Sequence, residues 1–149
     1  MSALLLICGG FLLAVLWFDL MFDVQVLRRR AGEVPEPVLA SIAAYYRRVT
    51  TDAAPMPYAV AAAMVTGLVS LLAQVLGGPT PRWVSLASLL LVGGAVALAL
   101  RVVPNAVRLG SRRDPVAVQS ALARAICRDH LVCLAAILLF LGLQVAATS

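Results

Sequence analysis

The sequence predicts an all-α integral membrane protein, a four-helix bundle with an interfacial helix between its first and second transmembrane helices. Of its 149 residues, 62% are hydrophobic and only 13% are charged, and the mean hydropathy is +0.98. A soluble domain of this length could not bury so much apolar surface, which excludes a conventional soluble enzyme, a disordered chain and a secreted disulfide scaffold. Four apolar stretches carry this composition, and each is close to the length that crosses a bilayer.

The expected spans are about residues 3–26, 58–76, 83–103 and 131–147, all within a single domain. Each approaches the roughly 20 residues that cross a hydrocarbon core of about 30 Å. The first span has no Arg or Lys before Leu4, and Trp17, Phe18 and Asp19 stand where a signal peptide would have a small-residue cleavage site. We therefore expect this span to be retained.

Prolines mark the starts of the remaining helices. After Pro35 and Pro37, apolar side chains recur at helical spacing over residues 38–50, which predicts the interfacial helix. Pro55 and Pro57 open the second span, and Pro115 follows an aspartate at the expected start of the fourth helix. Pro104 either bends the third helix or marks its end.

Arginine placement predicts the topology. All 12 basic residues are Arg and the net charge is +5. Ten of the 12 fall in the connections after the first and third spans: Arg28, Arg29, Arg30, Arg47, Arg48, Arg108, Arg112, Arg113, Arg124 and Arg128. Because positive charge marks the cytoplasmic side, both connections are expected inside and both termini on the outer side of a bacterial inner (cytoplasmic) membrane. This placement accounts for the basicity, so no nucleic-acid partner is expected.

Polar residues within the spans are the candidate site. Asp19 and Asp23 share one face of the first helix, Arg101 and Asn105 share a face of the third, and His130 opens the fourth span at a similar depth. A charge in hydrocarbon costs roughly 2.5 to 3.5 kcal/mol, so Asp19 and Arg101 are expected to pair. These residues predict a polar pocket in the inner half of the bundle, although a purely structural ion pair would produce the same pattern.

His130 is the only histidine, which excludes a multi-histidine metal site. Cys127 and Cys133 lie three residues to either side of it and could add few further ligands, so no metal site is assigned and no cofactor is identified. His130 and Asp19 are the candidate catalytic residues, because an imidazole and a carboxylate can exchange protons near neutral pH. Arg101, Asn105, Asp23 and Tyr58 are the candidate ligand-binding residues.

Three short motifs carry a family resemblance. They are the Tyr-Tyr-Arg-Arg segment at residues 45–48, the Pro104-Asn105 pair near the end of the third span, and the histidine that opens the fourth. Together with the four-span order, they resemble the anthrone-oxygenase-like family of small four-helix membrane proteins, mostly uncharacterised bacterial members. The resemblance implies a pocket that binds or oxidises a lipophilic aromatic or quinone-like molecule, with Pro104, Asn105 and His130 at matching positions.

Two other functions fit the sequence. The protein could be a non-catalytic accessory subunit of a larger membrane complex or a homo-oligomer, with ion pairs that serve only the architecture. It could also be a small proton-coupled exporter that uses a carboxylate in its first helix. Whether it is an enzyme is left open, and any activity is expected to be of an oxidoreductase or oxygenase kind. The lipid bilayer is a partner under all three hypotheses.

Overall fold

The computed structural model describes residues 2–28, 32–53 and 55–147. Within these ranges all regular structure is helical, which confirms the predicted all-α class. The long helices are α1 (Ser2–Asp23), α3 (Pro55–Gly77), α4 (Arg82–Ser111) and α5 (Val116–Ala146). By length and composition, the described part of the chain contains four helices able to cross a membrane. Arg29 and Arg30, which supported the topology prediction, lie outside the described residues.

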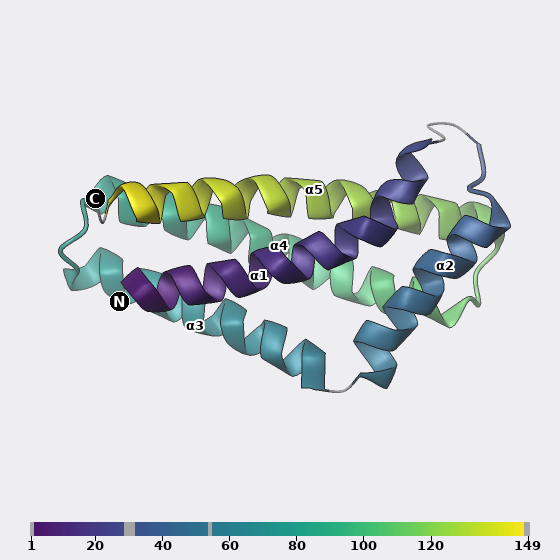
Figure 1. The fold of residues 1–149 in the computed structure, drawn as a ribbon, viewed down its shortest axis with the longest axis horizontal. Helices are drawn as coiled ribbons and strands as arrows, with labels where there is room; N and C mark the ends of the chain where they lie inside the picture. The colour runs from purple at the N-terminus through teal and green to yellow at the C-terminus, as the bar shows by residue number, and fades with distance from the viewer. Residues whose placement is uncertain (1, 29–31, 54, 148–149) are drawn as a thin grey trace.

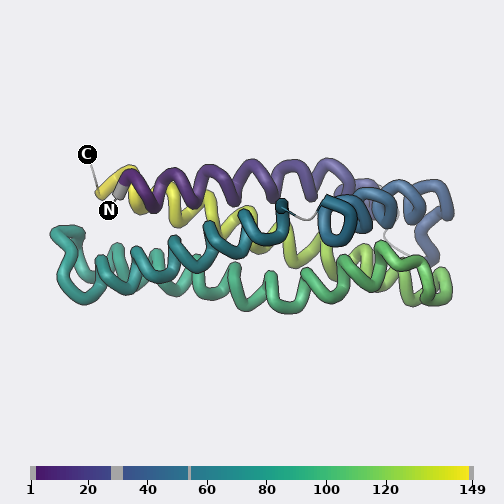
Figure 2. Tube along the Cα trace, turned by 90° about the horizontal axis from the view of Figure 1, so that it is seen from below, coloured from purple at the N-terminus to yellow at the C-terminus, as the bar shows by residue number. Residues whose placement is uncertain are grey.

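Shorter helices connect the first span to the second. A 3-10 helix (Val24–Arg28) extends α1, and α2 (Glu36–Arg47) leads through a π-helix (Arg48–Asp52) to α3. The first turn of α1 and the last turn of α5 lie at one end of the bundle, and α2 lies at the other (Figures 1 and 2). The arginine-containing connections on either side of α2 and between α4 and α5 therefore share this second end, which we call the basic end.

Two prolines were expected near helix boundaries, and the structure places one at a boundary and the other inside a helix. Pro115 is the N-cap of α5, as expected for a residue that lacks an N–H to leave unsatisfied, so the predicted helix start is confirmed. Pro104 lies inside α4, which continues to Ser111, so it does not end the third helix. With 30 and 31 residues, α4 and α5 are each roughly 45 Å long, so both exceed a hydrocarbon core of about 30 Å.

The basic end contains the largest buried apolar cluster. Leu39, Ile42, Ala43 and Tyr46 on α2 pack against α4 and α5. The approach is close at Gly110 of α4, where a Cβ atom would lie 2.8 Å from the backbone nitrogen of Arg47. The interfacial helix thus buries its apolar face against the extended ends of α4 and α5.

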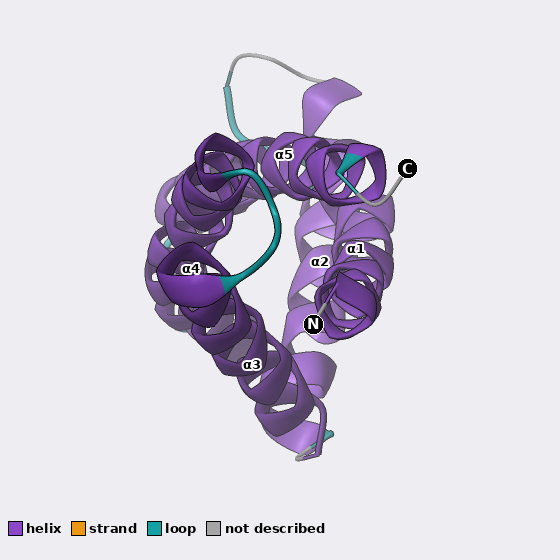
Figure 3. Cartoon of the chain, turned by 90° about the vertical axis from the view of Figure 1, so that its left-hand side faces the viewer, coloured by secondary structure: helices purple, strands orange, loops and turns teal. Residues whose placement is uncertain are grey.

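Helix α3 joins the bundle along only half of its length. Its buried residues are Gly67, Ser70, Leu71 and Gln74, all in the second half. A polar contact holds that half, because Gln74 lies 3.3 Å from Gln144 of α5 and donates to Thr80 at 2.7 Å. The first half diverges from α1 in Figure 1, and the end-on view in Figure 3 shows α3 extending away from α5.

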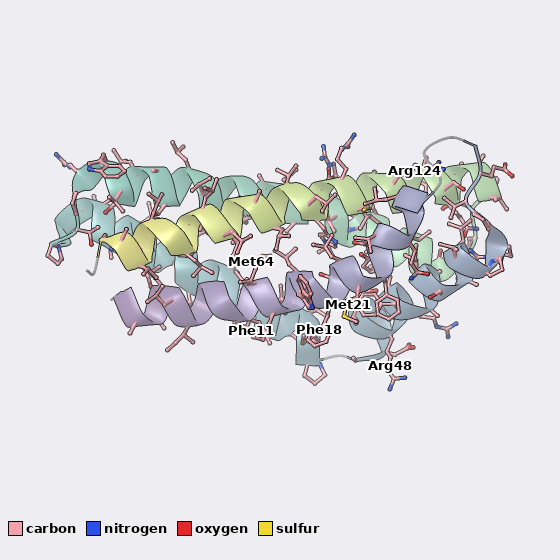
Figure 4. The ribbon with its side chains drawn as sticks, turned by 45° about the horizontal axis from the view of Figure 1, so that its top comes forward. Phe11, Phe18, Met21, Arg48, Met64 and Arg124 are labelled. Carbon is pink, nitrogen blue, oxygen red and sulfur yellow. The ribbon has the colours of Figure 1, made fainter. Side chains whose placement is uncertain are left out.

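Large apolar side chains cover the outside of the bundle. Phe11, Phe18 and Met21 follow one another along α1 and are exposed (Figure 4). Such a surface suits contact with lipid tails, and in water it would promote association.

Candidate functional site

Five buried or half-buried side chains from three helices form the polar cluster: Asp19 and Asp23 of α1, Tyr45 and Tyr46 of α2, and His130 of α5. The four-residue spacing of the two aspartates places both on the face of α1 that meets α2 and α5. Asp23 is fully buried, whereas the side chain of Asp19 retains 14% of its exposure.

The imidazole lies between the two carboxylates. His130 Nδ1 is 2.6 Å from Asp23 Oδ2, and His130 Nε2 is 3.9 Å from Asp19 Oδ2. Each remaining carboxylate oxygen accepts a phenolic hydrogen bond at 2.7 Å, Asp19 Oδ1 from Tyr45 and Asp23 Oδ1 from Tyr46. The cluster therefore ties the interfacial helix to both α1 and α5.

The two phenols act as hydrogen-bond donors. Burial, and next the negative charge of the neighbouring aspartates, raise the pKa of Tyr45 and of Tyr46 far above the usual 10.0. Both hydroxyls therefore keep their protons throughout the physiological range.

The structure brings some of the predicted site residues together and separates others. Asp19, Asp23 and His130 meet in the polar cluster. Arg101 and Asn105 lie elsewhere on α4, and Tyr58 is 76% exposed near the start of α3. The chemical roles assigned to these residues remain predictions.

The predicted pair between Asp19 and Arg101 is wrong. Arg101 instead donates two hydrogen bonds to Asp129 Oδ2 of α5, from Nε at 2.9 Å and from Nη2 at 2.7 Å. The side chain of Asp129 is only 3% exposed, so leaving it without a cationic partner would cost more free energy than leaving Asp19 without one. Both aspartates lie at similar depths, and depth alone could not choose between them.

Sequence reasoning assigned no site role to Tyr45, Tyr46 or Asp129. Two adjacent tyrosines on an amphipathic helix next to a span with two buried acids were the available signal for the phenols. Asp129 carries no such signal in the sequence, because its direction on α5 is useful only once the packing of α4 is known.

A groove of about 460 Å³ opens beside the polar cluster. Its walls come from α1, α3, α4 and α5 and are mostly apolar, with Met64 of α3 among the lining residues (Figure 4). Asp19, Tyr45, Tyr46 and His130 line its polar end. Since the first half of α3 has no buried residue, the groove is bounded on that side by a helix that diverges from the bundle.

In the ranges that the structure describes, no group of three or more His, Cys, Asp or Glu side chains could hold a metal ion. The three cysteines, Cys8, Cys127 and Cys133, are free thiols.

Comparison with known proteins identifies the family. A family model for SHR3 chaperones, described as ER membrane protein SH3, matches residues 1–147. The chain belongs to this family. No curated protein and no solved structure gives a significant match.

Membership in the SHR3 chaperone family corrects three predictions. The resemblance to anthrone oxygenases is wrong, because it depended on a few short motifs whereas the family match covers almost the whole chain. The expected binding or oxidation of an aromatic or quinone-like molecule is wrong with it. The bacterial inner membrane is wrong as well, because the family is one of the ER membrane. Arginine placement distinguishes the two sides of a membrane, and it carries no information about which membrane that is.

Proposed function

We propose that the protein is a chaperone of the ER membrane that holds a transmembrane helix of an unassembled membrane protein in the groove beside α3. The single observation that carries this proposal is the match of residues 1–147 to a family of chaperones that are themselves ER membrane proteins. Of the earlier hypotheses, the non-catalytic accessory role comes nearest, because a chaperone acts on other membrane proteins through contact alone.

The groove has the surface chemistry that a client helix requires. It is lined by apolar side chains from α1 and α4 and by the diverging half of α3. Helices in lipid gain no hydrophobic free energy on association, so close packing and polar contacts decide their affinity. Ala61, Ala95 and Ala99 along the groove are small enough to let another backbone approach closely.

The polar cluster keeps one wall of the groove rigid. Hydrogen bonds and ion contacts join α1, α2 and α5 at its polar end. The first half of α3, on the other side, has no buried residue and no comparable contact among those that the structure records for residues 55–66. A fixed wall facing a loosely packed helix suits a site that must accept helices of different sequence.

Orientation follows from the charge of the basic end. In the ER membrane, the positive-inside rule places the arginines of this end, including Arg47, Arg108 and Arg112, on the cytosolic face. The polar cluster then lies in the cytosolic half of the bilayer.

A reconstituted assembly assay tests the proposal. A multi-pass transporter is synthesised in a cell-free system into liposomes with or without the purified protein, and the fraction that elutes as a single species in mild detergent is measured. The wild-type protein should raise this fraction. Ala61→Trp should abolish the gain by filling the groove, whereas Ala62→Trp, on the adjacent residue outside the groove, should keep it.

Two results would count against the proposal. No gain with the wild-type protein would contradict the chaperone activity itself. An equal gain with both tryptophan variants would show that clients bind at some other surface.

A further inference from the structure

The groove has one charged end. Asp19 lines it and is partly accessible, whereas Asp23 is fully buried and does not line it. Tyr45 donates to Asp19 Oδ1 at 2.7 Å, and the nearest cationic partner of Oδ2 is His130 Nε2 at 3.9 Å, beyond hydrogen-bond length. Asp19 Oδ2 thus has acceptor capacity left for a donor that enters the groove.

Acidic groups outnumber basic ones in the cluster, because two aspartates face one imidazole. Among the described residues, His130 is the only one in a recorded ion pair with Asp19 or Asp23, whereas Arg101 and Arg128 both pair with Asp129. Negative charge beside a low-dielectric space attracts a cation more strongly than it would in water.

We infer that the groove selects client helices that carry a Lys or Arg in the cytosolic half of their span, and that Asp19 binds this side chain. The inference rests on the proposed chaperone function and names the class of client. Asp19 lies nine residues before Arg28 along α1 and the 3-10 helix, roughly 15 Å from the basic end. The basic residue of the client lies at the same depth.

The energetics explain why such helices need a chaperone. A Lys or Arg within a span is unfavourable in lipid until its partner subunit or helix is present. A carboxylate in the groove offsets part of this unfavourable free energy until the client has assembled with its partner. Tyr45 positions that carboxylate, since its hydroxyl occupies Oδ1 and leaves Oδ2 directed to other partners.

Binding of synthetic helices to the full-length protein tests the inference. The protein is placed in lipid nanodiscs, and fluorescence transfer measures its affinity for Leu/Ala transmembrane peptides that differ at one position off the centre, occupied by Lys, Leu or Glu. The Lys peptide should bind at least about tenfold more tightly than the Leu peptide. The Glu peptide should bind more weakly than the Leu peptide because of repulsion by Asp19.

Variants assign the preference to one residue. Asp19→Asn should remove the preference for Lys, so that the Lys and Leu peptides bind the variant with equal affinity. Asp52→Asn is the matched control, because this exposed acid lies on the π-helix outside the groove, and it should keep the full preference. If Asp19→Asn does not fold, the order of affinities of the three peptides for the wild-type protein tests the inference, since that comparison requires no variant.

The possible failures can be told apart. Equal affinity for the Lys and Leu peptides, with both blocked by Ala61→Trp, would overturn the inference and leave the groove as the client site. A Lys preference that survives Asp19→Asn would overturn the role of Asp19. Absence of binding by every peptide would overturn the inference, and the transporter assay would then judge the chaperone proposal independently.

Discussion

Replacing Tyr46 by Phe should destabilise the protein more than the same change at Tyr45, although both remove one hydroxyl that donates to an aspartate at 2.7 Å. The difference lies in the acceptor. Tyr46 donates to Asp23, which is fully buried, so nothing can replace the lost donor. A hydrogen bond to a charged group contributes about 1.5 to 3 kcal/mol, and we expect Tyr46→Phe to cost about 2 to 3 kcal/mol.

The loss at Tyr45 should be smaller. Its acceptor, Asp19, lines the open groove, where a water molecule can reach the carboxylate. We therefore expect Tyr45→Phe to cost about 0.5 to 1 kcal/mol. Because a phenylalanine ring fills almost the same volume, packing losses contribute little to either value.

Equilibrium unfolding in mixed micelles, with increasing SDS and helicity as the readout, measures both costs. A second measurement of Tyr46→Phe in the Asp23→Asn background isolates the interaction, and its cost there should fall by about 1 kcal/mol or more because the acceptor is no longer charged. Equal costs for the two tyrosines, or an undiminished cost in the Asp23→Asn background, would refute the reasoning.

Three further predictions concern the packing and the basic end. Arg101→Gln and Asp129→Asn should show a coupling free energy of about 1 kcal/mol or more in a double-mutant cycle of unfolding; additive costs would contradict the observed pair. Gly110→Ala should cost about 1 to 3 kcal/mol because its Cβ meets the backbone of α2, whereas Gly94→Ala, with no atom within 4 Å of its Cβ, should stay within about 1 kcal/mol of wild type in the same assay. Arg108 of α4 donates two hydrogen bonds to Asp114, which lies between α4 and α5, and holds the pKa of that carboxyl below its usual 3.8. The pair therefore stabilises the fold above this pH, and the stabilisation is lost as the pH falls through the lowered pKa. The difference in melting temperature between wild type and Asp114→Asn should therefore vanish in acid, and a difference that persists there would contradict the assignment.

Much of the fold could be predicted from composition alone. An apolar run of about 20 residues has few stable alternatives to a membrane-spanning helix, because lipid offers no partner for unpaired backbone groups. The start of α5 at Pro115 and the helix after Pro35 followed from the chemistry of proline, which acts locally. The shared depth of Asp19, Asp23 and His130 also followed from counting residues along each helix.

Tertiary packing decided what depth could not. Counting residues places a side chain at a level in the membrane, but its direction around the helix axis matters only relative to neighbours, and those are known only from the folded structure. For this reason the sequence predicts a pair between Asp19 and Arg101, whereas the folded structure pairs Arg101 with Asp129. The divergence of α3, which opens the groove, likewise arises from where Gln74 and Leu71 find partners on other helices. The sequence by itself therefore determined the helices and their polar layer, whereas only tertiary structure decided the pairs within that layer, because pairing depends on helix rotation and not on position along the chain.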